Sequence, residues 1–148
     1  MEFLIFVSFI FLALWSILGF GKLFENLFFD GSVQIDIGLT GFFGLFILSS
    51  IAYITHLFTP HNYIHNLILL FFGLTFFIYF YKNSQLRISK THYLIFFLLI
   101  IGVFLAKSHD DFGYYHLPNA LHFSQNKIEF GLGNLNHGFK HHSSIFYL

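Results

Sequence analysis

Long runs of apolar residues dominate the first 106 residues of the chain. Four runs contain no Asp, Glu, Lys or Arg, and they cover residues 3–20, 37–58, 63–81 and 91–106. A helix needs about 20 predominantly apolar residues to cross the hydrocarbon core of a bilayer. The pattern therefore predicts an all-α membrane protein with about four transmembrane helices, followed by a loop region at 107–148.

The first and last of these runs need a separate argument. No basic residue precedes the first run and no small-x-small site follows it, so we interpret it as a retained span rather than a cleaved signal peptide. The fourth run covers only about 24 Å at about 1.5 Å per residue, against a core of about 30 Å. The flanking Lys90 and Lys107 can complete this span by snorkelling to the headgroups.

Loop charge predicts how the spans are oriented. The short segment 82–90 has three basic residues and no acid, so the positive-inside rule places it in the cytoplasm. The connection 22–36 then also lies inside. The N-terminus, the turn at 59–62 and the region after Lys107 lie outside. Within the second span, Gly38, Gly41 and Gly44 fall on nearly one face and can allow close helix packing.

Composition narrows the class of protein further. Charged residues make up 9% of the chain and hydrophobic residues 56%, with a mean hydropathy of +0.71. A soluble domain has about 25% charged residues, and disorder requires low hydrophobicity, so both classes are excluded. Seven basic and seven acidic residues cancel, which argues against a nucleic-acid partner. The absence of cysteine excludes disulfides and thiol chemistry.

The candidate chemistry lies just beyond the fourth span. Asp110 and Asp111 form the only adjacent acid pair of the chain. One carboxylate can take a proton from an attacking hydroxyl while its neighbour holds a divalent cation such as Mg²⁺ or Mn²⁺. The alternative is a solvated pair that caps a following helix. Apolar residues at helical spacing over 117–125 predict such a short helix, lying on the outer membrane surface.

Histidines form a second group of candidates. Six of the ten histidines lie after residue 106, but none belongs to an H-E-x-x-H motif. They can bind a metal or remain plain loop residues. His56, His61 and His65 surround the predicted outer turn at 59–62. They are candidates for haem or proton-relay ligands. The alternative is a polar helix end that faces the headgroups.

The C-terminal region resembles uncharacterised bacterial multi-pass membrane proteins that are similar to the GT-C glycosyltransferase superfamily. The resemblance covers about the last 40 residues. It is carried by HDDFGYYHLP at 109–118, GLGNLNHGF at 131–139 and SSIF at 143–146.

The resemblance implies sugar transfer from a polyprenyl-phosphate-linked donor at the outer face of the cell (inner) membrane. It implies Asp111, with Asp110, as the catalytic acidic residues, with or without a divalent metal. By the same resemblance, His116, Asn134 and His137 are candidates for substrate binding.

GT-C enzymes are much longer than this chain. We therefore expect the 148 residues to be the N-terminal fragment of a longer transferase, inactive by itself. The alternative is a small non-enzymatic four-span membrane protein with a His-rich outer tail.

Overall fold

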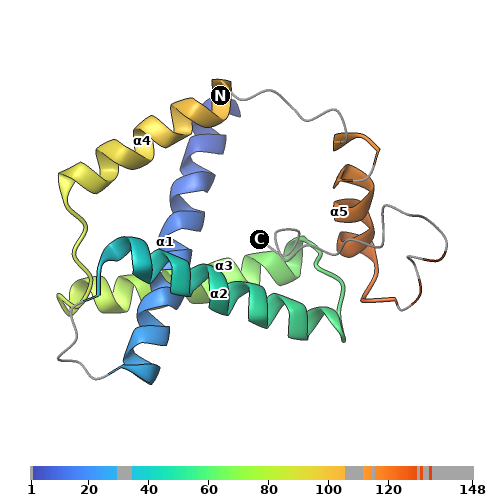
Figure 1. The fold of residues 1–148 in the computed structure, drawn as a ribbon, viewed down its shortest axis with the longest axis horizontal. Coiled ribbons are helices and arrows are strands. Elements are labelled where there is room, and N and C mark those ends of the chain that lie inside the picture. Colours follow the sequence, from blue (N-terminus) through green and yellow to red (C-terminus); the bar gives the residue numbers. More distant parts are fainter. Residues whose placement is uncertain are drawn as a thin grey trace. The chain divides into compact units, whose positions relative to one another are not determined.

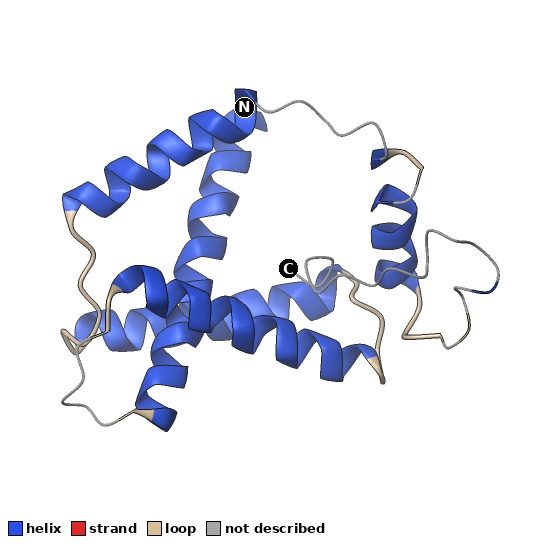
Figure 2. Cartoon of the chain, in the orientation of Figure 1, coloured by secondary structure: helices blue, strands red, loops and turns tan. Residues whose placement is uncertain are grey.

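The computed structural model describes residues 2–29, 35–105, 112–114, 116–129, 131 and 134. Within this part of the chain the protein is built from α-helices and contains no strand (Figures 1 and 2). The predicted helical class is therefore confirmed for the described residues. The five helices are α1 (Glu2–Phe28), α2 (Ile37–His56), α3 (Tyr63–Lys82), α4 (Lys90–Leu105) and α5 (His116–Gln125).

Three of these helices are long and apolar enough to cross a membrane. α1 offers 26 residues from Phe3 to Phe28, while α2 and α3 offer 20 residues each. Large apolar side chains on them, such as Phe42 and Phe71, are exposed in the isolated chain, as lipid-facing residues would be. α4 is apolar but has only 16 residues, so a fourth crossing does not follow from its length.

The helix bounds differ most from the prediction at the end of α1. The sequence pattern places the end near Phe20, but the helix runs to Phe28. The charged residues Lys22 and Glu25 are accommodated inside the helix because they pair with each other at 2.7 Å. α2, α3 and α4 begin and end within two residues of the predicted runs.

The chain divides into two compact units. Unit 1 comprises Met1–Leu45 and Leu70–Lys107, and unit 2 comprises Phe46–Leu69 and Ser108–Leu148. Unit 1 therefore holds α1, α4, the first part of α2 and most of α3. Unit 2 holds the end of α2, the start of α3, the turn between them and α5.

Unit 1 is organised around close backbone contacts of α1 with both α2 and α3. A Cβ atom on Gly19 would overlap the carbonyl oxygen of Gly73 in α3, and one on Gly44 of α2 would overlap the carbonyl oxygen of Ile17. Small residues at these crossings let the helix backbones touch. On the predicted glycine face of α2, Gly44 makes such a close backbone contact. A Cβ atom added at Gly41 would lie 3.9 Å from a side-chain atom of Leu18, which is an ordinary contact distance.

Apolar side chains fill the space around the crossing. Leu18, Phe77, Phe80 and Leu86 form a buried cluster, and the Trp15 ring stacks on Phe77 with centroids 5.7 Å apart. α4 joins the unit near the other end of α1, where Phe104 contacts Phe3 and Phe6. The core of unit 1 therefore consists of aromatic and aliphatic side chains packed around the glycine contacts.

Candidate functional site

The predicted catalytic residues fall largely outside the described part of the chain. Asp110, Asp111 and His137 lie outside the described residues, so their arrangement stays a prediction. His116 is the first residue of α5. Asn134 donates its backbone N–H to the carbonyl of Gly131 at 2.9 Å, in a turn where Gly131 has a φ of 93°. Glycine readily adopts a positive φ because it has no Cβ atom.

The structure does bring three other candidate residues together, in unit 2. We call this group, made of His56, His61 and His65, the histidine column. The rings of His61 and His65 stack almost in parallel, with centroids 4.3 Å apart and planes 10° apart. The ring of His56 lies 4.5 Å from that of His61. The end of α2, the turn and the start of α3 each supply one ring.

Hydrogen bonds hold each ring of the column in place. Nε2 of His61 lies 2.8 Å from the carbonyl oxygen of Ala52, and Nε2 of His65 lies 2.8 Å from Oγ1 of Thr55. Since a carbonyl oxygen only accepts, Nε2 of His61 carries the hydrogen. Two of the three rings are buried, since His56 is 0% exposed and His61 is 7% exposed.

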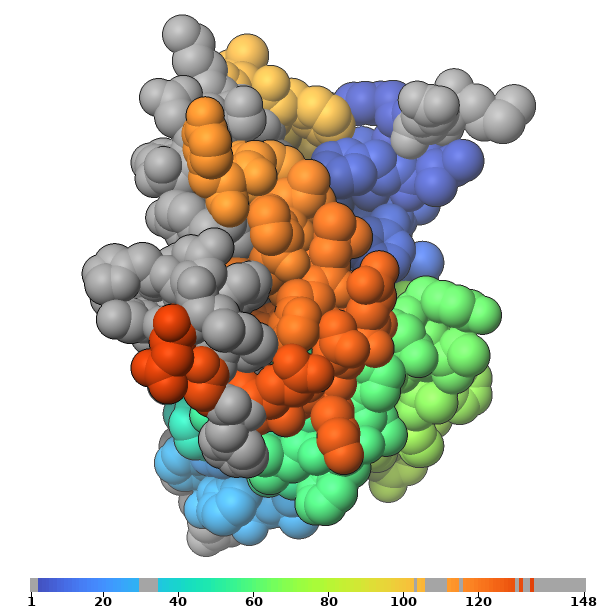
Figure 3. Space-filling model, turned by 90° about the vertical axis from the view of Figure 1, so that its right-hand side faces the viewer, coloured from blue at the N-terminus to red at the C-terminus, as the bar shows by residue number. Residues whose placement is uncertain are grey.

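The same residues fasten α5 to the turn between α2 and α3. The backbone N–H of His61 donates to the carbonyl of Phe123 at 2.8 Å, and the N–H of Ile128 donates to the carbonyl of His56 at 3.0 Å. Nε2 of His56 lies 2.9 Å from the carbonyl oxygen of Asn126. Figure 3 shows α5 against the residues of this turn, with α5 in orange and the turn in green.

Apolar contact reinforces these bonds. Phe123 is 4% exposed and packs with Ala52, which is 1% exposed. The Phe123 ring also meets the ring of His56 edge-on, with centroids 4.9 Å apart. The joint between α5 and the turn is therefore a small core in which imidazole rings replace some of the usual aliphatic side chains.

Burial makes the centre of the column a poor place for a positive charge. Loss of hydration lowers the pKa of His61 to about 4, and the neighbouring His65 and His56 lower it further, while the hydrogen bond to the Ala52 carbonyl opposes the shift. The ring of His61 is therefore neutral at physiological pH. A neutral ring with one N–H suits the hydrogen bond that the structure shows.

The three histidines of the column do not form a metal-ion site. Among the described residues no group of three or more His, Cys, Asp or Glu side chains is arranged to hold a metal ion. The column instead uses its ring nitrogens on protein carbonyl and hydroxyl oxygens. Its arrangement fits a structural joint that depends on neutral rings.

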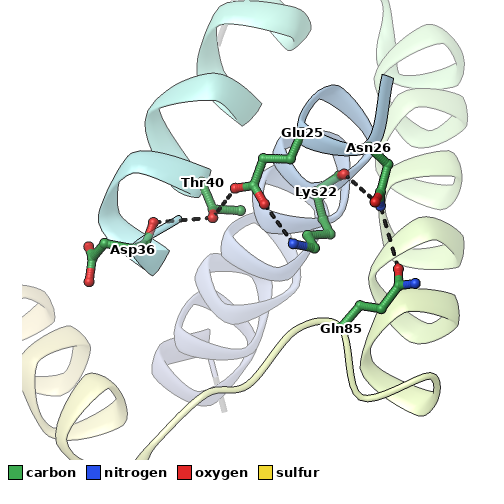
Figure 4. Close-up of polar contacts among 6 residues, drawn as sticks. All are labelled: Lys22, Glu25, Asn26, Asp36, Thr40 and Gln85. Carbon is green, nitrogen blue, oxygen red and sulfur yellow. Dashed lines mark hydrogen bonds and ion pairs between the residues drawn. The ribbon is translucent and has the colours of Figure 1, made fainter. Parts of the chain in front are cut away.

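Unit 1 contains a second polar cluster, which the sequence analysis missed (Figure 4). Glu25 is 4% exposed, and its two oxygens accept from Nζ of Lys22 at 2.7 Å and from the hydroxyl of Thr40. Nδ2 of Asn26 reaches Oε1 of Gln85 at 3.5 Å. Glu25 thus ties α1 to α2, and Asn26 ties α1 to the loop after α3.

The sequence pattern does not reveal the cluster, because it predicts that 22–36 is a cytoplasmic connection, in which charges are solvated. The signal that could have found it is the three-residue spacing of Lys22 and Glu25, which places the pair on one helix face. Both carboxylate oxygens of Glu25 are engaged by neighbours, so the cluster suits helix docking rather than catalysis.

Comparison with known families gives one result. A family model described as a domain of unknown function, DUF8201, matches residues 3–148. The chain belongs to the DUF8201 family. The match covers α2, α3, α4, α5 and all of α1 except Glu2, so both units contribute to the DUF8201 domain. No curated protein and no solved structure matches the chain.

Proposed function

We propose that this DUF8201 domain is the N-terminal part of an integral membrane glycosyltransferase, which uses a polyprenyl-phosphate-linked sugar at the extracytoplasmic face of the cell membrane. The motif around Asp110 and Asp111 supplies the chemical part of this proposal. The structural observation that supports it is the attachment of α5 to the turn between α2 and α3.

That attachment bears on how often the chain crosses the membrane. α3 has 20 residues, or about 30 Å of helix, so a crossing α3 separates Tyr63 and Lys82 onto opposite faces. α5 is bonded to His61, at the Tyr63 end. The chain would then return between Lys82 and His116, and α4 is the apolar helix among the described residues of that interval. On this argument α4 is the fourth span.

The charge of the connecting loop sets the orientation. The segment 82–90 carries three basic residues and no acid, which favours the cytoplasm. With four spans, α5 and the residues just before it then lie outside. The acid pair would face the compartment in which GT-C enzymes meet their lipid-linked donors.

In the proposed reaction Asp111 accepts the proton of the acceptor hydroxyl. The hydroxyl oxygen forms a bond to the anomeric carbon of the sugar, the bond from that carbon to the phosphate oxygen breaks, and polyprenyl phosphate leaves. Asp110 offers the oxygen ligands that Mg²⁺ or Mn²⁺ prefers. His116, Asn134 and His137 are the proposed substrate contacts.

The test is sugar transfer by membranes from cells that express the complete reading frame, with labelled polyprenyl phosphosugars as donors. Asp111→Asn should lower transfer by about 100-fold or more, since it removes the general base. Glu129→Gln is the matched control, because Glu129 is an exposed acid in the same region, and it should retain transfer. Undiminished transfer by Asp111→Asn would contradict the proposal. A frame ending at Leu148 whose membranes transfer none of the donors would contradict it too.

A further inference from the structure

We propose that the histidine column is a pH-sensitive latch, which holds α5 on the turn between α2 and α3 while its rings are neutral and releases α5 when they are protonated. The proposal concerns the joint within unit 2 and is independent of the transferase activity proposed above. It rests on the stacking and hydrogen bonding of the three rings and on the burial of His56 and His61.

The ring contacts favour the neutral state of the column. His61 lies between the other two rings, at 4.3 Å from His65 and 4.5 Å from His56. A proton on any one ring places a charge against its neighbours, and a second proton adds direct repulsion between like charges. Neutral imidazoles pack at these distances without that repulsion.

The contacts with α5 explain why a charge would open the joint. His56 and His61 are both hydrogen-bonded to the segment 123–128. His61 donates its backbone N–H, and His56 bonds through its backbone carbonyl and its ring. A charged imidazole must regain water, because burying an ion costs far more than burying a neutral ring. Phe123 covers the ring of His56, so water reaches the column when α5 moves off the turn.

The other titratable groups around the column fit this picture. His122 of α5 accepts at Nδ1 from Nδ2 of Asn126 at 3.2 Å, so a proton at this atom would break that bond. Its Nε2 lies 3.7 Å from the carboxylate of Glu129. Both partners of that pair belong to the α5 segment, so the pair moves with α5. His122 also faces His56 across the joint, so a charge on His122 would act in the same direction as a charge on the column.

The direction of the pH effect follows from the shift at His61. Its pKa is about 4 in the docked state and returns toward the usual 6.5 once water reaches the ring. The released state therefore binds the proton more readily. Docking weakens as the pH falls below about 6.5 and stops weakening below about 4, with a total change in the docking equilibrium on the order of 100-fold.

The joint can be measured with two spin labels, because the chain has no cysteine of its own. Cysteines replace Tyr63 and Gln125, which are both exposed and both in unit 2. In lipid nanodiscs the distance distribution between the labels should be narrow at pH 7.5. At pH 4 it should shift and broaden, reversibly. An unchanged distribution at pH 4 would overturn the proposal.

Two variants test whether the histidine column causes the pH-dependent release of α5. His61→Gln keeps a side-chain N–H for the Ala52 carbonyl but cannot be protonated, so its pH response should be at least 10-fold weaker than that of the parent. His92→Gln changes a histidine of α4 and should respond like the parent. A full response in a docked His61→Gln protein would overturn the proposal.

If α5 does not dock in the His61→Gln variant at pH 7.5, a measurement on the unmodified chain can still test the latch. Amide hydrogen exchange of His61 and Ile128, which donate across the joint, should accelerate about 100-fold between pH 7.5 and pH 4 after correction for intrinsic chemistry. Amides in the middle of α1 serve as the reference. Equal protection of the two joint amides at both pH values would contradict the latch.

Discussion

Glu25 shows how a single buried residue fixes helix positions in this protein. Its carboxylate accepts from Lys22 on its own helix and from Thr40 on α2, and it is almost completely buried. A buried carboxylate is costly unless it is paired and hydrogen-bonded. Lys22 supplies the ion pair and Thr40 the second hydrogen bond, so burial of the Glu25 charge is tolerated. Because Thr40 belongs to α2, these contacts form in only one arrangement of α1 and α2.

Replacing Glu25 tests this role. Glu25→Gln removes the ion pair and places an amide against the ammonium of Lys22, while the side-chain shape is kept. We expect the free energy of unfolding in detergent to fall by about 1–3 kcal/mol, since a buried group loses its partner. Glu129→Gln, at an exposed position, should change stability by less than about 0.5 kcal/mol. Equal stability of the two variants would show that the buried pair contributes nothing.

The elements of unit 1 meet through glycine rather than through large side chains. The backbones of α1 and α3 touch at Gly19 and Gly73, and those of α1 and α2 touch near Gly44. Lipid-embedded helices gain little from burying apolar surface against each other, so close backbone approach provides much of the packing energy. The same logic does not extend to Gly102 in α4, where an added Cβ atom would meet nothing within 4 Å.

Single alanine substitutions should separate these two kinds of glycine. Gly19→Ala and Gly73→Ala force backbones apart and should each destabilise the protein by about 1–3 kcal/mol. Gly102→Ala should be neutral or slightly stabilising, because alanine has the higher helix propensity. The comparison can be made by thermal unfolding in one detergent. Indistinguishable melting of Gly19→Ala and Gly102→Ala would refute the close crossing.

The attachment of α5 to the turn between α2 and α3 can be tested by removing the Phe123 ring. Phe123→Ala empties the small core beneath α5 and should release the helix, at a cost of about 3–5 kcal/mol for the joint. Leu121→Ala alters an exposed residue of the same helix and should leave α5 docked. Hydrogen exchange of residues 117–126 measures the difference. Full protection of α5 in Phe123→Ala would mean that the hydrogen bonds alone hold it.

The helices could be predicted from sequence, and most of their contacts could not. An uninterrupted apolar run predicts a helix from local information, which is why α2, α3 and α4 lie where the pattern places them. The contact of Glu25 with α2 depends on Thr40, which is far from Glu25 in sequence. His61 and His65 are four residues apart, which predicts their proximity, but nothing local indicates that Phe123 covers His56.

The topology that we propose for this chain has four membrane crossings. Three helices have the length and hydropathy for this, and the fourth crossing is inferred from the bonds between α5 and the α2–α3 turn. On that proposal, the residues after α4 follow a fourth crossing and emerge on the side of the membrane opposite the basic loop 82–90. The transferase proposal depends on this arrangement.

The most direct test is the accessibility of single cysteines to a membrane-impermeant maleimide, in intact cells and in inside-out vesicles. The exposed positions Thr59, Asn83 and Gln125 report on the α2–α3 turn, the basic loop and the end of α5. With four spans, cysteines at 59 and 125 should react in intact cells, whereas a cysteine at 83 should react only in inside-out vesicles. Labelling of positions 83 and 125 from the same side would contradict it.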